Sequence, residues 1–334
     1  MQRSFFLIAA LVLVTSIYSA EPVRFVLDTD LGNDADDAMA IAITHALQNR
    51  NECELLAVTT TKDNPYVAPM IDILNTFYGR PDIPIAVVKN GKTPDDGRYN
   101  RQVFELKDDN GNPLYPRRLL PEDSSKLPDA VPFLRKLLAE QPDKSVVLVQ
   151  IGFFTNFARL LDTPADAISP LTGKELVAKK VKLLSLMAGS FNSSGHLEYN
   201  VVMDIPSAKK LVAEWPTEMI FNGFEIGEHI QHPPASIRED YGYVKHHPLK
   251  DTYKFYVGDN PQPTFDLSSI LFAVRPNRGY YDLSQCGTVS FGDDGKTTFT
   301  PSATGKHRYM IVSPEQKAMV REAFVQLCSE PPKR

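Results

Sequence analysis

The sequence predicts an α/β fold with a single large domain, in which helices flank a mostly parallel, Rossmann-like central sheet. Of its 334 residues, 43% are hydrophobic and 23% are charged, which is typical of a globular protein with a large core. Short apolar runs alternate with longer amphipathic segments along the chain. No repeat and no linker-like change of composition divides it, so we expect one domain rather than two.

Six short apolar runs are the predicted strands. Each run is apolar on both faces and is separated from the next by a longer segment, a pattern typical of a parallel sheet covered by helices on both sides. The runs are residues 23–27, 55–58, 85–88, 146–149, 181–186 and 219–221.

Amphipathic segments between and after these runs are the predicted helices. They are residues 36–48, 67–78, 130–140, 207–214 and 315–327. The last helix has a clear start signal, because Ser313 can cap it, Pro314 suits its first turn and Gln316 can complete a capping box.

Two long polar stretches interrupt the pattern. Residues 89–127 are rich in Asp, Asn, Arg and Pro, and residues 232–264 are rich in Pro and Tyr. Loops of this length in a compact domain are usually functional rims or lids. The second stretch also contains tyrosines that could stack on a planar ligand, although packing within the loop is the simpler interpretation for each one: Tyr241, Tyr243, Tyr253 and Tyr256.

The N-terminus has the pattern of a secretory signal peptide. Arg3 precedes a run of apolar residues, 5–14, and a small polar stretch then ends at Ala20. We therefore expect residues 1–20 to be a signal peptide and residues 21–334 to form the mature catalytic domain.

An uncleaved membrane anchor is the alternative for this segment, because Tyr18 is bulky where a small residue is usual before a cleavage site. No later stretch approaches the ~20 apolar residues that a transmembrane helix needs. The sequence thus predicts a secreted or periplasmic protein with no stable membrane insertion after cleavage.

Charge and cysteine content exclude two classes of protein. Lys and Arg number 36 against 41 Asp and Glu, and no basic block stands out, so the sequence does not predict a nucleic-acid partner. Three cysteines, Cys53, Cys286 and Cys328, are too few for a disulfide scaffold. A single bridge between Cys286 and Cys328 and three free thiols are both open alternatives.

The most informative segment is the end of the first predicted strand, where residues 28–38 read DTDLGNDADDA. Asp28 and Asp30 share one face of a strand, and Asp36 and Asp37 fall in the first turn of the next helix, whose dipole favours anions. This segment therefore lies at the carboxyl edge of the predicted parallel sheet, where open α/β folds bind ligands. Clustered carboxylates there predict a site for Ca²⁺ or Mg²⁺. A solvated acidic turn is the alternative, and it would account for Asp34 and Asp36.

Two other acidic motifs are similar to this segment in part. An EF-hand is excluded, because Asn33 and Met39 stand where its loop needs Gly and Glu. A phosphatase of the haloacid-dehalogenase type would use Asp28 and Asp30 as nucleophile and acid. That pattern has Thr or Val at the position of Gly32, so it remains only a weaker alternative.

The segment DTDLGNDADDA resembles DTDxGxDDA, the N-terminal signature of the inosine-uridine preferring nucleoside hydrolase family, with two extra residues. On this alignment Asp30 keeps its place, and Asp36 and Asp37 rather than Asp34 match the final pair of acids. Later segments resemble the family in the right order, over residues 23–276. They are TTTKDN with Asn64, GFFTN with Thr155, LEYN with Glu198 and Asn200, and a late aspartate, Asp266.

The resemblance implies the nucleoside hydrolase fold, assembly as a homodimer or homotetramer, and calcium-dependent hydrolysis of ribonucleosides to free base and ribose. It implies a Ca²⁺ ion held by Asp30, Asp37, the backbone carbonyl of Thr155, and Asp266, with Asp30 also acting as the general base. The residues that it places around the ribose are Asp36, Asn64, Asn192, Glu198 and Asn200. If LEYN is extended, Glu198 and Asn200 lie on one side and Tyr199 on the other.

The sequence departs from the family on the side of the leaving base. Some members carry His immediately before the late aspartate, where this chain has Phe265. The proton donor is therefore unassigned, with His196, His229 and His232 as the nearest candidates by sequence and aromatic stacking as the alternative. Since this change removes a catalytic group more readily than a binding group, a nonhydrolytic calcium-dependent nucleoside or sugar binder is the alternative function.

Overall fold

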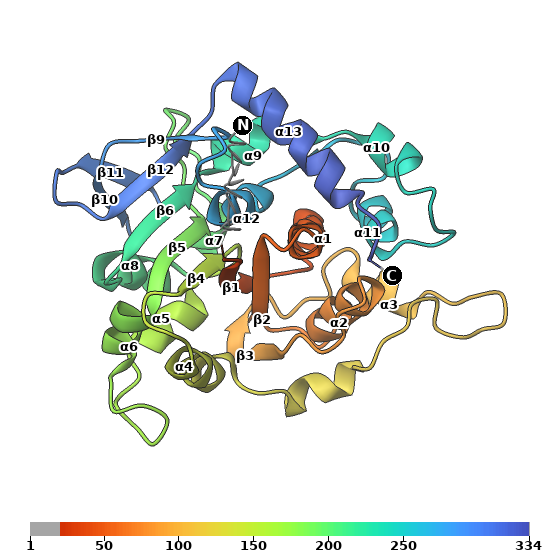
Figure 1. Ribbon diagram of the computed structural model, residues 1–334, viewed down its shortest axis with the longest axis horizontal. Helices are drawn as coiled ribbons and strands as arrows, with labels where there is room; N and C mark the ends of the chain where they lie inside the picture. The colour runs from red at the N-terminus through yellow and green to blue at the C-terminus, as the bar shows by residue number, and fades with distance from the viewer. Residues whose placement is uncertain (1–20, 334) are drawn as a thin grey trace, which may run out of the picture.

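A ten-stranded mixed sheet runs through the centre of the molecule (Figure 1). The computed structural model describes residues 21–333, so the predicted signal peptide, residues 1–20, lies outside the described residues. The strand order is β11-β10-β12-β6-β5-β4-β1-β2-β3, and β9 pairs with β12. All neighbours from β12 to β3 in this order pair in parallel.

Each of the six predicted strands is confirmed. They are β1 (Val23–Thr29), β2 (Cys53–Lys62), β3 (Ile85–Lys92), β4 (Val146–Gln150), β5 (Val181–Met187) and β6 (Glu218–Asn222). The remaining strands were not predicted, because they are short and lack an apolar run: β7 (Gln231–His232), β8 (Gln262–Pro263), β9 (Asp282–Leu283), β10 (Gly287–Phe291), β11 (Thr297–Pro301) and β12 (His307–Ile311).

Helices cover both faces of the sheet (Figure 1). One face packs against α1 (Asp36–Asn49), α2 (Val67–Phe77) and α12 (Leu267–Val274), and α13 (Pro314–Cys328) packs against α1. The other face packs against α4 (Ala130–Glu140), α5 (Thr155–Leu161), α6 (Gly173–Lys180) and α8 (Ile205–Glu214). The predicted capping box of α13 is present, since the Ser313 hydroxyl accepts from Gln316 N and the Gln316 side chain accepts from Ser313 N.

The two polar stretches are not loops throughout, which corrects the sequence-based expectation. The first contains α3 (Asn100–Glu105) and the 3₁₀ helix η1 (Pro121–Lys126), and the second contains α10 (Pro234–Glu239) and α11 (Pro248–Val257). Two further short helices, α7 (Tyr199–Met203) and α9 (Phe224–His229), follow β5 and β6. Helices this short carry too few turns for a periodic pattern to be recognised.

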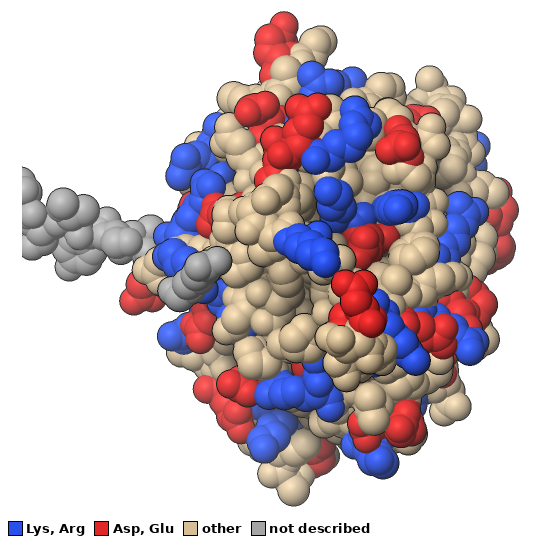
Figure 2. All heavy atoms as spheres, turned by 90° about the vertical axis from the view of Figure 1, so that its right-hand side faces the viewer, with Lys and Arg blue, Asp and Glu red and all other residues tan. Residues whose placement is uncertain are grey.

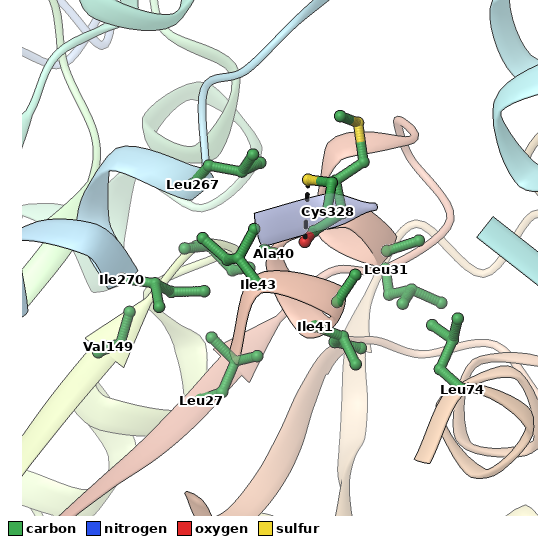
Figure 3. Packing of buried hydrophobic residues seen from close by; sticks show 14 of the residues in the cluster. Leu27, Leu31, Ala40, Ile41, Ile43, Leu74, Val149, Leu267, Ile270 and Cys328 are labelled. Carbon is green, nitrogen blue, oxygen red and sulfur yellow. Dashed lines mark hydrogen bonds between the residues drawn. The ribbon is translucent and has the colours of Figure 1, made fainter. Parts of the chain in front are cut away.

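Helix α1 lies at the centre of the larger hydrophobic core (Figure 3). Ile41 and Ile43 are fully buried there. Leu27 of β1 lies on the sheet side of α1, and Cys328 of α13 lies on the other side with its thiol directed at the carbonyl of Met39. The acidic first turn of α1 is thus held by a helix that cannot move without opening this core.

The cysteines are all free, so the alternative of a bridge between Cys286 and Cys328 is wrong. Cys53 and Cys328 are buried, whereas Cys286 is exposed. Among residues 21–333, no helix combines the length and the apolar character needed to cross a membrane. On the face seen in Figure 2, basic and acidic side chains are interspersed rather than gathered by sign.

We expect thiol titration to reflect this arrangement. In the native protein, one thiol, that of Cys286, should react rapidly with an aromatic disulfide reagent, because the other two are buried. After denaturation without a reductant, all three should react. Recovery of a single reactive thiol in the denatured protein would show a disulfide and contradict the structure.

Candidate functional site

The acidic segment lies where β1 ends, at the carboxyl edge of the parallel sheet. Asp28 pairs with Thr59 of β2 on one side and with Gln150 of β4 on the other. Asp30 is the first residue after the end of β1. A Cβ atom at Gly152, just after β4, would lie 2.6 Å from the Asp30 nitrogen. Position 152 therefore needs glycine, since only a residue without a side chain lets the two chain segments approach this closely.

A tight turn connects Asp30 to α1. Gly32 has φ 120°, a left-handed conformation that favours glycine, and the Asn100 side chain donates to the Leu31 carbonyl at 2.8 Å. Helix α1 then begins at Asp36 with both Asp36 and Asp37 in its first turn. The helix dipole offsets part of the cost of placing these two carboxylates side by side.

Burial and mutual repulsion raise the pKa of every acid in this cluster. Burial raises the pKa of Asp30 to about 7 and that of Asp36 to about 6. For Asp37 and Asp266, burial and then repulsion from the neighbouring aspartates hold the pKa well above its usual range. Asp266 is brought to the cluster from far along the chain, because it lies at the start of α12. A cation would favour the ionised form of all these groups.

The donor atoms of the cluster fit a hard divalent cation. Asp34, Asp36 and Asp266 each offer a carboxylate oxygen, and these oxygens lie within 4.8 Å of one another. One Asp36 oxygen accepts from the Asp266 backbone nitrogen at 3.0 Å, and the other is buried with no hydrogen-bond partner. An unpaired buried carboxylate oxygen is costly, and coordination of Ca²⁺ or Mg²⁺ would satisfy it.

This group of three acids differs from the ligand set that the family resemblance implies. Asp266 belongs to both sets. Asp30 instead accepts a hydrogen bond from Asn33 at 2.6 Å, and the Asp37 carboxylate accepts from the Thr29 hydroxyl. Thr155 is the first residue of α5, and its hydroxyl donates to Asp204, which precedes α8. The alternative of a solvated turn fails for Asp36, which is fully buried.

Lys62 is a functional candidate that the sequence analysis missed. Its buried ammonium donates to the Asn33 side chain and to the Thr93 carbonyl at 2.9 Å each, and it pairs with Asp95 at 3.4 Å. Its charge lowers the pKa of Asp30 and Asp37, against the larger effect of burial. The signal for this residue is a lysine that directly follows residues 55–61, a stretch of only apolar and threonine side chains.

A cavity of about 430 Å³ opens above the cluster. Its acidic lining comes from Asp30, Asp34, Asp95, Glu198 and Asp266. Its aromatic lining comes from His196, Tyr199, Phe224, Tyr256 and Phe265. A cavity with polar groups on one part and rings on another suits a ligand that joins a polyol to a planar heterocycle.

Glu198 and Asn200 both line the cavity, but the segment that carries them is not extended as the sequence analysis considered. Glu198 caps α7, and its carboxylate accepts from the backbone nitrogens of Asn200 at 2.7 Å, Gly189 at 3.1 Å and Val201 at 3.2 Å. Burial nevertheless raises the pKa of Glu198 to about 7. The capping bonds fix this carboxylate at the cavity wall.

Asn64 and Asn192 lie outside the lining of this cavity and stabilise loops beside it. The Asn64 amide donates to the carbonyls of Pro94 and Asp95 at 3.0 Å each. The exposed Asn192 side chain accepts from the Ser194 backbone nitrogen at 2.9 Å. A direct contact of either side chain with substrate stays a prediction.

Both polar stretches contribute to the cavity, as expected of functional rims. The first supplies Asp95, Gly97 and Arg98, and the second supplies Tyr256. The Arg98 guanidinium lies over the Tyr256 ring, 5.2 Å from its centroid. The other three candidate tyrosines are engaged elsewhere: Tyr241 and Tyr253 are buried, and Tyr243 contacts His247.

Residues 25–311 match the sequence model of the family described as inosine-uridine preferring nucleoside hydrolase. A search of curated proteins found no match. A solved plant nucleoside hydrolase is 19% identical, with a TM-score of 0.70 over 93% of this chain and 100% of that chain.

Two bacterial structures are also similar to this chain in fold. A purine-preferring ribonucleoside hydrolase from Gardnerella vaginalis is 15% identical, with a TM-score of 0.66 over 92% of this chain and 99% of that chain. An inosine-uridine preferring nucleoside hydrolase from Bacillus anthracis is 15% identical, with a TM-score of 0.67 over the same shares, 92% and 99%. At these identities the structural likeness establishes the fold.

Divalent cations should stabilise the protein more at pH 8 than at pH 5. The folded-state pKa values of Asp30 and Asp36 are raised to about 7 and about 6, above those of the unfolded chain. The metal-free protein therefore loses stability as pH rises from about 4 to about 7, while cation binding requires the ionised acids. Thermal unfolding with Ca²⁺, Mg²⁺ or EDTA at the two pH values checks this.

Asp293→Asn is the matched control, because Asp293 is an exposed acid paired only with Lys209. This variant should keep the full cation-induced rise in Tm, whereas Asp266→Asn should lose it. A cation-induced rise in Tm of equal size at both pH values, or one that Asp266→Asn retains, would contradict a site built from carboxyl groups with raised pKa values.

Proposed function

The chain belongs to the inosine-uridine preferring nucleoside hydrolase family, and on that basis we propose that it hydrolyses the N-glycosidic bond of ribonucleosides to free base and ribose with the aid of Ca²⁺. The observation that carries the proposal is the juxtaposition of buried acids and aromatic rings around one cavity. Family membership supports a hydrolase acting on N-glycosyl bonds. The all-carboxylate cluster supports a hard cation.

Asp30 is the proposed general base. It lines the cavity, and its carboxylate is oriented by the hydrogen bond from Asn33. Beside a bound cation the Asp30 carboxylate would be ionised, and an ionised carboxylate can accept a proton from water. Gly152 holds the Asp30 backbone against β4, so the position of this base is fixed by the sheet.

Glu198 and Asn200 are the proposed ribose contacts. Cleavage builds positive charge on the sugar ring, and a carboxylate fixed beside the ring would stabilise that charge. The Asn200 amide nitrogen donates to the carbonyl of Met187 at 3.2 Å, which orients the amide at the cavity wall. Asp36, also expected at the ribose, is outside the cavity lining and accepts a hydrogen bond from the backbone nitrogen of Asp266.

The cation would be held by Asp266 together with acids of the segment from Asp30 to Asp37. When bound, it would lower the pKa of a coordinated water and polarise ribose hydroxyls. Its binding would also relieve the repulsion that raises the pKa of these carboxyl groups.

The alternatives are not favoured. A phosphatase nucleophile must reach its substrate, but Asp28 is fully buried and its carboxylate accepts from Thr59 at 2.5 Å and Asn156 at 2.8 Å. The nonhydrolytic binder, which Phe265 in place of His suggested, would use the same site, and membership of a hydrolase family favours the enzyme. The two bacterial hydrolases of similar structure differ in base preference, since one is described as purine-preferring and the other as inosine-uridine preferring.

Ribose release from inosine, uridine and other nucleosides tests the proposal. Wild type should release ribose with Ca²⁺ and lose this activity after chelation. Asp30→Asn should lower kcat by about 10²-fold or more, because general-base catalysis contributes about 10²–10⁴-fold. Asp293→Asn should match wild type. Undiminished turnover after complete metal removal, or in Asp30→Asn, would overturn the mechanism.

We also propose that the protein is exported, on the basis of the signal-like pattern in residues 1–20. Expression of the full chain in a host that secretes proteins should yield extracellular or periplasmic product whose N-terminal sequence starts at Glu21. An intracellular product that retains Met1 would contradict export.

A further inference from the structure

The leaving base needs a proton that the residue next to Asp266 cannot give. When the bond between C1′ and the base nitrogen breaks, its electron pair stays on the base, and protonation of the base lowers the barrier to departure. Phe265 precedes Asp266 in the cavity lining and has no exchangeable proton. A donor must therefore come from another part of the lining.

Three rings form a continuous stack along the cavity. His196 stacks on Phe224 with ring centroids 3.6 Å apart and an interplanar angle of 20°. Phe224 in turn stacks on Phe265 with centroids 5.2 Å apart, also at 20°. Because Phe265 is followed by Asp266, the stack begins where the acidic lining ends. A base attached to a ribose at the acids would therefore contact this stack.

His196 is held in place by its own turn. The Ser194 hydroxyl accepts from the His196 backbone nitrogen at 3.3 Å, and Asn192 accepts from the Ser194 backbone nitrogen at 2.9 Å. Gly195 allows this turn through a φ of 70°. The imidazole nitrogens of His196 make no hydrogen bond to any residue from 21 to 333, so they are free to contact a ligand.

The other candidate donors are less suitable. Of the histidines in the described chain, His196 alone lines the cavity. His229 is exposed and bonded to the Glu225 carbonyl, and His232 is buried away from the cavity. Burial raises the pKa of Tyr199 to about 12, and that of Tyr256 is raised as well, which makes both phenols weaker acids.

We propose that His196 is the general acid that protonates the departing base. The imidazolium gives one proton to a ring nitrogen of the base as the C1′–N bond breaks, and water adds to C1′ after giving one proton to Asp30. Solvent then restores the proton of His196 and accepts that of Asp30, so the sum is nucleoside plus water to ribose plus base. This inference rests on the proposed function and adds to it the group that activates the leaving base.

The test compares two substrates that differ in their need for a proton. The leaving group of inosine is a base that must be protonated, whereas the leaving group of 4-nitrophenyl riboside is a stable phenolate. His196→Gln should lower kcat for inosine by about 100-fold or more, the range of a general acid, and change kcat for the 4-nitrophenyl substrate by less than about threefold. His229→Gln, a change at an exposed histidine, should leave both rates unaltered.

Each outcome has a distinct meaning. Equal losses of kcat on both substrates, an unchanged kcat on inosine, or an effect confined to KM would overturn the role of His196. Retained cleavage of the 4-nitrophenyl substrate shows that the variant is folded and that its water-activating groups are intact. If the wild type cleaves neither substrate, the proposed function itself is wrong and this inference falls with it.

Discussion

Crowding of carboxylates in a buried position is the constraint on which the site depends. Asp30, Asp36, Asp37 and Asp266 are each at most 4% exposed, and repulsion adds to burial in raising the pKa of each. Lys62 supplies one compensating charge, but it is already bonded to Asn33, Thr93 and Asp95. Burial of like charges costs free energy of folding, and a bound cation would offset that cost.

The fold assembles this cluster from distant parts of the chain. The sheet fixes Asp30 through the close contact with Gly152, and the core around α1 fixes Asp36 and Asp37. Helix α12 packs against α1 and brings Asp266 to the same point. The aromatic stack continues from the neighbouring residue Phe265, so one short segment joins the acidic lining to the rings that would receive a base.

The sequence predicted the parallel strands, the long helices and the acidic edge, because these follow from local pattern: buried runs, amphipathic periods and caps. It did not predict the β10–β11 hairpin or the short helices α7 and α9, which have no such pattern. Within the site, motifs located Asp266, Glu198 and Asn200 at the cavity. They could not reveal that Asn64 and Asn192 stabilise loops, since that depends on contacts between segments whose approach only the folded chain determines.

The position of the cation tests the central claim most directly. Crystals grown with Ca²⁺ and measured at long wavelength should show one anomalous peak per chain, bonded at about 2.3–2.6 Å to a carboxylate oxygen of Asp266 and to acids of the segment from Asp30 to Asp37. Such a peak would also decide which of those acids are ligands. An empty cluster at saturating Ca²⁺, or an ion bound only elsewhere, would contradict the account.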